Sequence, residues 1–235
     1  MNEPTPATDR SFLLNVCHVI TGLPRRGAQT MLSYLLAGFN RHRFCMNVVS
    51  LTEIGAVGEQ IQGLGVDVTA LNMRPGRVNP IDVGKLALQI RKRQIDVVQT
   101  WMYHSDLLGG IAGRIVGRPV IWNIRQSDLN SKKSKRTTLW TANACAYLSR
   151  WIPERIVCCS EAARVVHGSL GYDSTRMVVI GNGVSVDRFR PDADASDQVR
   201  CELGIEKGVP LIGLVARFHP QKDHRTFLKA AALLH

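Results

Sequence analysis

Seven short apolar segments alternate with helical ones, and this alternation constrains the fold more than any other feature of the sequence. The first segment, Phe12–Ile20, is a continuous apolar run, typical of a strand buried on both faces of a parallel sheet. Regular alternation of such strands with helices predicts an α/β fold with a parallel sheet. The other expected strands are Met46–Leu51, Val66–Leu71, Ile95–Trp101, Arg118–Ile124, Arg155–Cys159 and Met177–Ile180.

The helices expected between these strands have recognisable ends. Pro80 lies in the first turn of one helix, where proline is tolerated. Ser160 is a good N-cap for another helix, and Gly171 ends it. The expected helices are Ala28–Phe39, Gly55–Leu64, Pro80–Arg93, Leu107–Val116, Thr137–Arg150 and Glu161–Leu170.

Composition narrows the partners and the compartment. The chain has 235 residues, 45% of them hydrophobic, enough for one large or two small domains with a core. Its net charge of +11 favours acidic partners such as nucleotide diphosphates, anionic lipid surfaces or nucleic acid. Six cysteines without CxxC spacing indicate a reducing compartment.

Residues 1–11 are polar and expected to be disordered, and no apolar run reaches the ~18 residues of a membrane span. We expect a cytoplasmic protein, at most peripheral on a membrane.

Three candidate site residues follow strands at the edge where open α/β sheets bind ligands. Gly27 lies in the turn after the first strand, and the alternative is a plain tight turn. His104 follows the fourth expected strand, and a structural histidine is the alternative. Arg125 follows the fifth. A permanent cation cannot act as a general base at neutral pH, but it can pair with a carboxylate or phosphate.

A second group of basic residues lies near the end of the chain. Arg217 and Lys222 flank a turn between a short apolar run, expected as a strand over 210–216, and a helix that Asp223 would cap. A guanidinium and an ammonium beside a helix N-terminus form an anion site that suits a diphosphate. The alternative is a pair of solvated surface cations.

A basic loop precedes the expected helix Thr137–Arg150. Its cations could contact an anionic lipid-linked acceptor or a membrane surface, or they could be solvated. The aromatic residues beside it are expected in the core. The cations are Lys132, Lys133, Lys135 and Arg136, and the aromatics are Trp140, Tyr147 and Trp151.

No metal site is expected. The string Asp192-Ala-Asp194 has the D-x-D form that binds metal in some enzymes, but it lies in a polar segment that we interpret as a linker. We therefore expect no metal and no cofactor.

Three motifs resemble glycosyltransferase family 4. Residues 213–222 fit Gly-x-Val-x-Arg-x-x-Pro-x-Lys, which opens the family's donor-binding domain, and residues 179–191 resemble its Ile-Pro-Asn-Gly-Val passage with Gly181 in place of proline. The loop over 22–29 is similar to the family's Gly-Leu-x-x-Gly-Gly-Ala-Glu loop, with Arg26 and Gln29 as departures. Arg125 stands where much of the family has histidine. A subgroup of bacterial surface-polysaccharide enzymes, which this chain resembles, has arginine at this position.

The resemblance implies the GT-B fold, in which two Rossmann-like, doubly wound parallel sheets face each other. Residues 12–190 would form the acceptor-side domain, 191–209 a linker, and 210–235 the start of a truncated donor-side domain. The family's Glu-x7-Glu segment would lie beyond residue 235, so we expect this chain to be inactive alone.

The resemblance also implies an activity. The parent enzyme would transfer a sugar from a nucleotide diphosphate sugar to an acceptor hydroxyl with retention, in cell-surface polysaccharide or glycolipid synthesis. Gly27, Arg217 and Lys222 would bind the diphosphate, and His104 and Arg125 would orient donor or acceptor. Two alternatives stay open: a GT-B nucleotide-sugar epimerase, and a non-enzymatic basic module, against which the absence of a nucleic-acid-binding motif argues.

Overall fold

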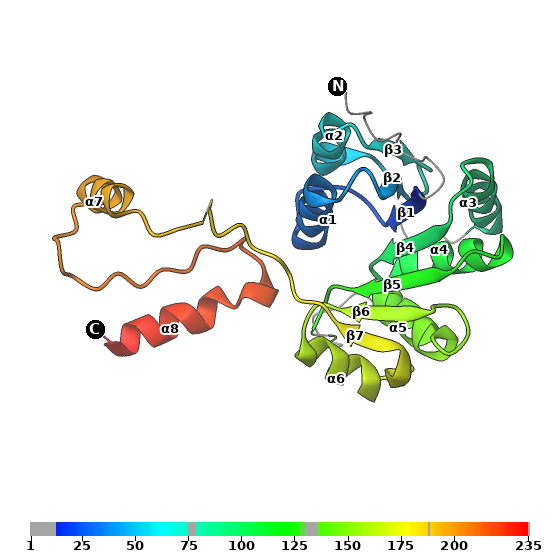
Figure 1. Cartoon of the computed structure of the whole chain (residues 1–235). Helices are drawn as coiled ribbons and strands as arrows, with labels where there is room; N and C mark the ends of the chain where they lie inside the picture. Colours follow the sequence, from blue (N-terminus) through cyan, green and yellow to red (C-terminus); the bar gives the residue numbers. More distant parts are fainter. Residues whose placement is uncertain (1–12, 75–78, 128, 130–135, 188, 235) are drawn as a thin grey trace, which may run out of the picture. The chain divides into compact units, whose positions relative to one another are not determined.

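The computed structural model describes residues 13–74, 79–127, 129, 136–187 and 189–234 of the chain (Figure 1). The chain divides into two compact units, Met1–Gly183 and Val184–His235. The basic-loop residues Lys132, Lys133 and Lys135 lie outside the described residues.

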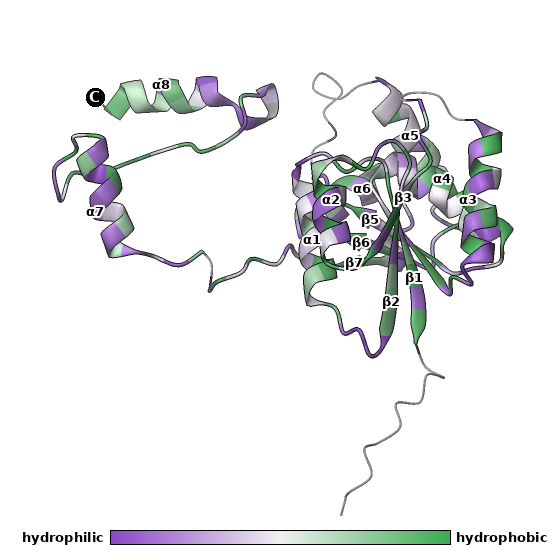
Figure 2. Ribbon diagram, turned by 90° about the horizontal axis from the view of Figure 1, so that it is seen from above, coloured by the Kyte–Doolittle hydropathy of each residue, from purple (hydrophilic) through white to green (hydrophobic). Residues whose placement is uncertain are grey.

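A seven-stranded parallel sheet forms the centre of the first unit, in the order β3-β2-β1-β4-β5-β6-β7. The sequence predicted all seven strands, and their ends differ from the prediction by at most two residues. Figure 2 shows the central strands largely in the hydrophobic colour, as expected for strands covered on both faces. The strands are β1 (Leu14–Ile20), β2 (Phe44–Ser50), β3 (Asp67–Ala70), β4 (Val97–Trp101), β5 (Val120–Ile124), β6 (Arg155–Cys158) and β7 (Met177–Val179).

The helices cover the two faces of this sheet in two groups. One core cluster joins α1 (Gly27–Gly38) and α2 (Gly55–Gly63) to one face. A larger cluster joins α3 (Pro80–Lys92), α4 (Tyr103–Ile115) and α5 (Arg136–Leu148) to the other. The helix α6 (Glu161–Ser169) and the short 3-10 helix η2 (Ser174–Arg176) precede β7. The sheet is therefore doubly wound, and the change of face falls between the neighbouring strands β1 and β4.

The helix α4 approaches the sheet closely because glycines face the strands. A Cβ atom on Gly110 would lie 2.8 Å from Trp122 Nε1 and 2.7 Å from Ile152 Cγ2. A Cβ atom on Gly113 would lie 2.7 Å from Val120 Cγ2. These distances leave no room for a side chain, so the backbone of α4 packs directly on β4 and β5.

The prediction that Trp140, Tyr147 and Trp151 are core residues was wrong. Their exposed fractions are 80%, 71% and 52%. The face of α5 that packs on the core consists of small side chains, Ala142, Cys145 and Ala146. Since a helix buries only one stripe of its surface, the aromatic side chains on the opposite stripe remain in solvent.

The second unit contains helices, and one predicted element is missing from its described residues. It has α7 (Ala193–Glu202), the 3-10 helix η3 (Pro220–Lys222) and α8 (His224–Leu234). The predicted strand over 210–216 was wrong: these residues form no strand, and Val215 is 103% exposed. A strand needs a neighbour for its hydrogen bonds, and the described part of this unit offers no second strand.

None of the helices that the structure describes is both long and apolar enough to cross a bilayer.

We expect Gly110→Ala to destabilise the first unit by about 1–3 kcal/mol, because the added methyl group must displace the Trp122 and Ile152 side chains. Chemical denaturation of the purified chain measures this change. Gly84→Ala in α3 is the matched control: its Cβ atom meets nothing within 4 Å, so we expect stability to be unchanged or to rise by up to about 1 kcal/mol. Equal effects of the two substitutions would contradict the tight packing of α4.

Candidate functional site

The carboxyl ends of β1, β4 and β5 form one edge of the sheet, and each carries a predicted site residue. Gly27 opens α1 after β1, His104 is the second residue of α4 after β4, and Arg125 follows β5 directly. The three strands are neighbours in the sheet. Because β1 and β4 send their helices to opposite faces, their loops part at this edge, and ligands bind there in doubly wound sheets.

The loop between β1 and α1 is held by a buried amide. Gln29 is buried, and its Nε2 donates a hydrogen bond to the carbonyl oxygen of Gly22 at 2.9 Å. The neighbouring loop presses on Gly22, where a Cβ atom would lie 2.6 Å from Thr52 Oγ1. A carboxylate cannot donate to a carbonyl oxygen, which gives the departure to glutamine at position 29 a physical reason.

The N-terminus of α1 has the features of an anion site. Its N-cap residue, Arg26, makes no side-chain capping hydrogen bond, and the first turn contains no acidic residue. The first N–H groups of a helix lack partners within the helix and favour negative charge. A Cβ atom on Gly27 would meet nothing within 4 Å, and the φ angle of Gly27 is not positive. The fold therefore does not require glycine at position 27.

His104 belongs to the first turn of α4, a correction to the predicted helix start at Leu107. Its Nε2 lies 3.5 Å from Thr141 Oγ1, and that hydroxyl donates to the carbonyl oxygen of Thr137 at 2.8 Å. A hydrogen bond to this hydroxyl therefore puts the imidazole proton on Nε2 and the basic lone pair on Nδ1. Burial lowers the pKa of His104, which favours the neutral imidazole at neutral pH.

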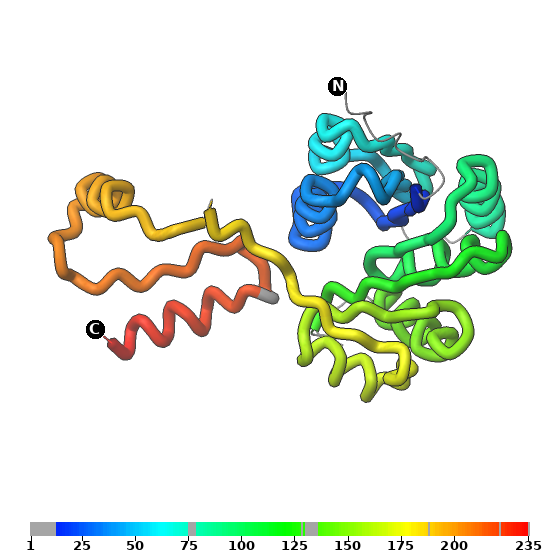
Figure 3. The backbone as a smooth tube through the Cα atoms, in the orientation of Figure 1, coloured from blue at the N-terminus to red at the C-terminus, as the bar shows by residue number. Residues whose placement is uncertain are grey.

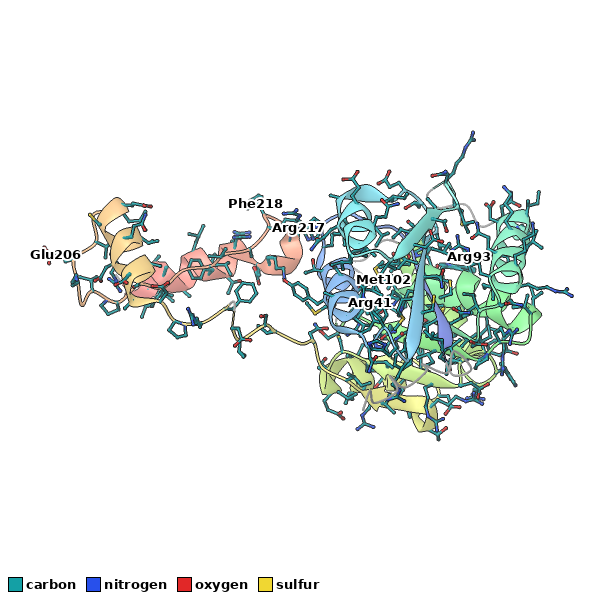
Figure 4. The ribbon with its side chains drawn as sticks, turned by 45° about the horizontal axis from the view of Figure 1, so that its top comes forward. Arg41, Arg93, Met102, Glu206, Arg217 and Phe218 are labelled. Atoms are coloured by element: carbon teal, nitrogen blue, oxygen red, sulfur yellow. The ribbon has the colours of Figure 1, made fainter. Side chains whose placement is uncertain are left out.

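The backbone at the start of α4 is constrained. Met102, labelled in Figure 4, is the residue between β4 and α4 and has a φ angle of 73°. Its N–H donates to the carbonyl oxygen of Asn123 at 3.2 Å, which ties the end of β4 to β5. Non-glycine residues with positive φ are uncommon and concentrate at functional sites.

Arg125 is fixed by three contacts at the end of β5. Its guanidinium carbon lies 4.6 Å from the centroid of the Trp101 ring, a cation–π arrangement. Nη1 donates to Asn182 Oδ1 at 2.9 Å, and Nη2 donates to Asn123 Oδ1 at 3.3 Å. Burial lowers the pKa of Arg125, but a guanidinium is so strong a base that the group stays charged at neutral pH. The result is an oriented cation at the sheet edge.

Trp101 is in turn positioned by a buried histidine. Trp101 Nε1 donates to His18 Nδ1 at 3.2 Å, so the imidazole proton lies on Nε2, 3.4 Å from Met46 Sδ. Burial lowers the pKa of His18 to about 4, which keeps the imidazole neutral and able to accept this hydrogen bond. The contacts thus run from β2 through β1 and β4 to Arg125.

A buried carboxyl group lies behind the start of α4. Thr100 Oγ1 donates to Asp106 Oδ1 at 2.5 Å, and Asp106 is fully buried. Burial raises the pKa of Asp106 well above its ordinary value. This residue therefore supports the end of β4 and does not offer a charged ligand to the edge. Among the described residues, no cluster of three or more histidine, cysteine, aspartate or glutamate side chains could hold a metal ion.

The remaining predicted residues belong to other elements. Arg217 and Lys222 belong to the second unit and are exposed, and Figure 4 shows Arg217 and Phe218 on the segment that precedes α8. The predicted cap is present there: Asp223 Oδ1 accepts from the N–H of Thr226 at 3.4 Å. Arg136 is exposed at the first position of α5.

Trp101 and Asn182 were not predicted as partners of Arg125, nor His18 as the partner of Trp101. Trp101 and His18 had the pattern of ordinary strand residues, and Asn182 that of a turn. Only strand order could reveal the contacts, because it places β4 between β1 and β5.

The chain is similar to known glycosyltransferases. The sequence profile of Glycosyltransferase Family 4 matches residues 25–188. Two curated relatives are similar. EpsF of Bacillus subtilis (strain 168), named as a glycosyltransferase, is 27% identical over 93% of this chain and 58% of its own length. The UDP-Gal:alpha-D-GlcNAc-diphosphoundecaprenol alpha-1,3-galactosyltransferase of Escherichia coli is 28% identical over 60% of this chain and 37% of its own. The match thus spans little more than half of EpsF and little more than a third of the E. coli relative.

Solved structures show the same fold. HepE from Anabaena, crystallised with UDP, has a TM-score of 0.77 and 18% identity, and the match covers 94% of this chain and 58% of HepE. A crystal structure of the same protein with UDP-glucose gives a TM-score of 0.76.

Acidification provides a test of the buried His18. The pKa of His18 is 6.5 in the unfolded chain and about 4 in the folded chain. At pH values between these two, His18 binds a proton in the unfolded chain but not in the folded chain. The free energy of unfolding should therefore fall by about 2 kcal/mol from about pH 7 to about pH 5 through this residue alone. Urea denaturation at both pH values measures the change.

His18→Gln is the comparison, because glutamine can also accept from Trp101 but does not titrate. The raised pKa of Asp106 acts with the opposite sign, but both proteins share it, so it cancels in the difference. An identical pH dependence in the two proteins would show that His18 is not held neutral.

Proposed function

The chain belongs to glycosyltransferase family 4, and on this basis we propose that its protein transfers a sugar from a nucleotide diphosphate sugar to an acceptor hydroxyl with retention of anomeric configuration. The observation that carries the proposal is the uncapped N-terminus of α1 at the point where the sheet changes face. We place the protein in the cytoplasm, in the synthesis of bacterial surface polysaccharide or glycolipid. The name of the E. coli relative, which contains a diphosphoundecaprenol-linked sugar, supports a role in glycolipid synthesis.

The diphosphate is the group that this edge is suited to bind. Transfer breaks the bond between the anomeric carbon and a diphosphate oxygen, so negative charge grows on the leaving group. The N–H groups at Gly27 stabilise that charge without a metal ion. Arg217 and Lys222, which belong to the second unit, are separate candidates for binding a diphosphate. Such preorganised donors lower the barrier because they need no rearrangement during the reaction. HepE binds UDP, and the E. coli relative uses UDP-galactose, which favours a UDP-sugar donor.

His104 and Arg125 have separate roles in this proposal. His104 orients the acceptor hydroxyl by accepting its hydrogen bond at Nδ1, which a neutral imidazole can do. Arg125 cannot remove a proton at neutral pH, so it pairs with an anionic group of donor or acceptor. The acceptor is a glycan or a lipid-linked sugar, which Lys132, Lys133, Lys135 and Arg136 contact. The lipid diphosphate acceptor in the name of the E. coli relative supports the latter.

The direct test is a transfer assay with the protein that carries this sequence. UDP-glucose, UDP-galactose and UDP-N-acetylglucosamine are incubated with a polyprenyl-diphosphate sugar, and the products are analysed by mass spectrometry and NMR. We expect one donor to give a glycosylated acceptor with a retained anomeric centre. Release of an epimerised sugar nucleotide without any transfer would contradict the proposal.

Gly27→Ala separates ligand binding from folding. The added methyl group meets no protein atom within 4 Å, so stability should be unchanged, while a donor phosphate at the N–H groups of α1 would be displaced. We expect UDP affinity, measured by calorimetry, to fall about tenfold or more through loss of hydrogen bonds to a charged group. Gly84→Ala, on α3, should leave UDP affinity unchanged. Unaltered affinity in Gly27→Ala would place the diphosphate elsewhere.

A further inference from the structure

The outward side of α5 carries aromatic and basic side chains and no acidic ones. We call this surface the α5 outer face, and it consists of Arg136, Trp140, Asn143, Tyr147, Arg150 and Trp151. The spacing of four and three residues puts these side chains on one stripe of the helix and its end. All six are exposed, and the Tyr147 and Trp151 rings contact each other edge to face with centroids 5.1 Å apart.

This face holds both exposed tryptophans of the chain. The chain has four tryptophans, of which Trp101 and Trp122 are buried. Trp140 and Trp151 are exposed, and both lie on the α5 outer face. Large exposed aromatic groups that gather on one surface are unusual in a soluble domain and mark interaction sites. Tryptophan and tyrosine beside arginine are the residues that favour the polar–apolar boundary of a bilayer.

The charge of the surrounding sequence has one sign. Residues 129–153 contain five lysines and arginines and no aspartate or glutamate. The next acidic residue, Glu154, is paired with Arg114 at 3.0 Å. An uncompensated positive segment that includes exposed aromatic groups is complementary to an anionic lipid surface. A second copy of the chain would instead bring two positive faces together, which disfavours self-association through this surface.

The position of α5 links this face to the candidate site. Arg136 opens α5 on the side of the carboxyl edge, because the helix follows the loop that leaves β5. Thr141, in the second turn of α5, lies 3.5 Å from His104. The side chains of the α5 outer face therefore begin within two helical turns of the residue assigned to the acceptor. Figure 1 shows α5 beside the strands β5 and β6, on the outside of the first unit.

We propose that the α5 outer face docks the protein onto an anionic lipid bilayer, with Trp140, Tyr147 and Trp151 in the headgroup region. The inference deepens the proposed function, since a lipid-linked acceptor would then reach His104 from the same surface. It rests on the proposed function only for this consequence; the docking itself depends on the exposed aromatics and the charge.

Vesicle binding tests the proposal without any sugar or nucleotide. The 235-residue chain is sedimented with vesicles of phosphatidylcholine that contain about one third phosphatidylglycerol, and with pure phosphatidylcholine vesicles. We expect binding to the anionic vesicles, weakened as NaCl rises from about 0.1 to about 0.5 M. We also expect a blue shift of tryptophan fluorescence on binding, because Trp140 and Trp151 would leave water for the headgroup region. Trp101 and Trp122 are buried and should not contribute to the shift.

Two variants locate the surface. Trp140→Ser combined with Tyr147→Ser should lower the partition coefficient about tenfold or more, because the apolar contribution of both rings is lost. Tyr34→Ser is the matched control: Tyr34 is a partly exposed aromatic residue on α1, which covers the opposite face of the sheet, and binding should be unchanged. Thermal unfolding of both variants should stay within about 2 °C of the parent chain, because surface substitutions rarely alter stability.

Three outcomes would overturn the docking. They are equal binding to neutral and anionic vesicles, full binding by the Trp140→Ser, Tyr147→Ser variant, and salt-resistant dimers through this face in place of vesicle binding. These results are separable from those on the transferase activity. Failure to bind UDP with intact vesicle binding would remove the proposed function alone, and UDP binding without vesicle binding would remove the docking alone.

Discussion

The change of face between β1 and β4 is the constraint on which the candidate site depends. These neighbouring parallel strands send α1 and α4 to opposite sides of the sheet, so their loops cannot pack on each other at the carboxyl edge. The N-terminus of α1 is exposed at this edge, and its first N–H groups have no side-chain cap. Close packing of the glycines of α4 fixes that helix on β4 and β5. The topology thus exposes the helix N-terminus that we propose as the diphosphate site.

Arg125 shows how a buried network can orient a cation without neutralising it. None of its three named partners is acidic: an indole ring and two amide oxygens hold the guanidinium in place. A carboxylate partner would orient the group as well, but it would also satisfy its charge and weaken attraction for a phosphate. The neutral His18 behind Trp101 continues the same principle into the core. Orientation by uncharged groups leaves the positive charge available to a ligand.

The sequence predicted the strands and the residues of the sheet edge, because burial on both faces and Gly, Ser and Pro at the turns leave local signals. It did not predict contacts that depend on strand order, such as Trp101 with Arg125. It failed for Trp140, Tyr147 and Trp151, because amino-acid type indicates core while the position on α5 indicates solvent. It also failed for the segment over 210–216, where an apolar pattern predicts a strand but pairing requires a neighbour.

Hydrogen–deuterium exchange with and without UDP tests the central claim most directly, since it reports on backbone N–H groups. The account predicts slower exchange over residues 27–30, at the start of α1, when UDP is present, with little change over α3, which is remote from the diphosphate. Protection at the start of α1 would establish that the diphosphate binds where β1 and β4 diverge. Unchanged exchange there, under conditions in which calorimetry shows UDP bound, would contradict the account.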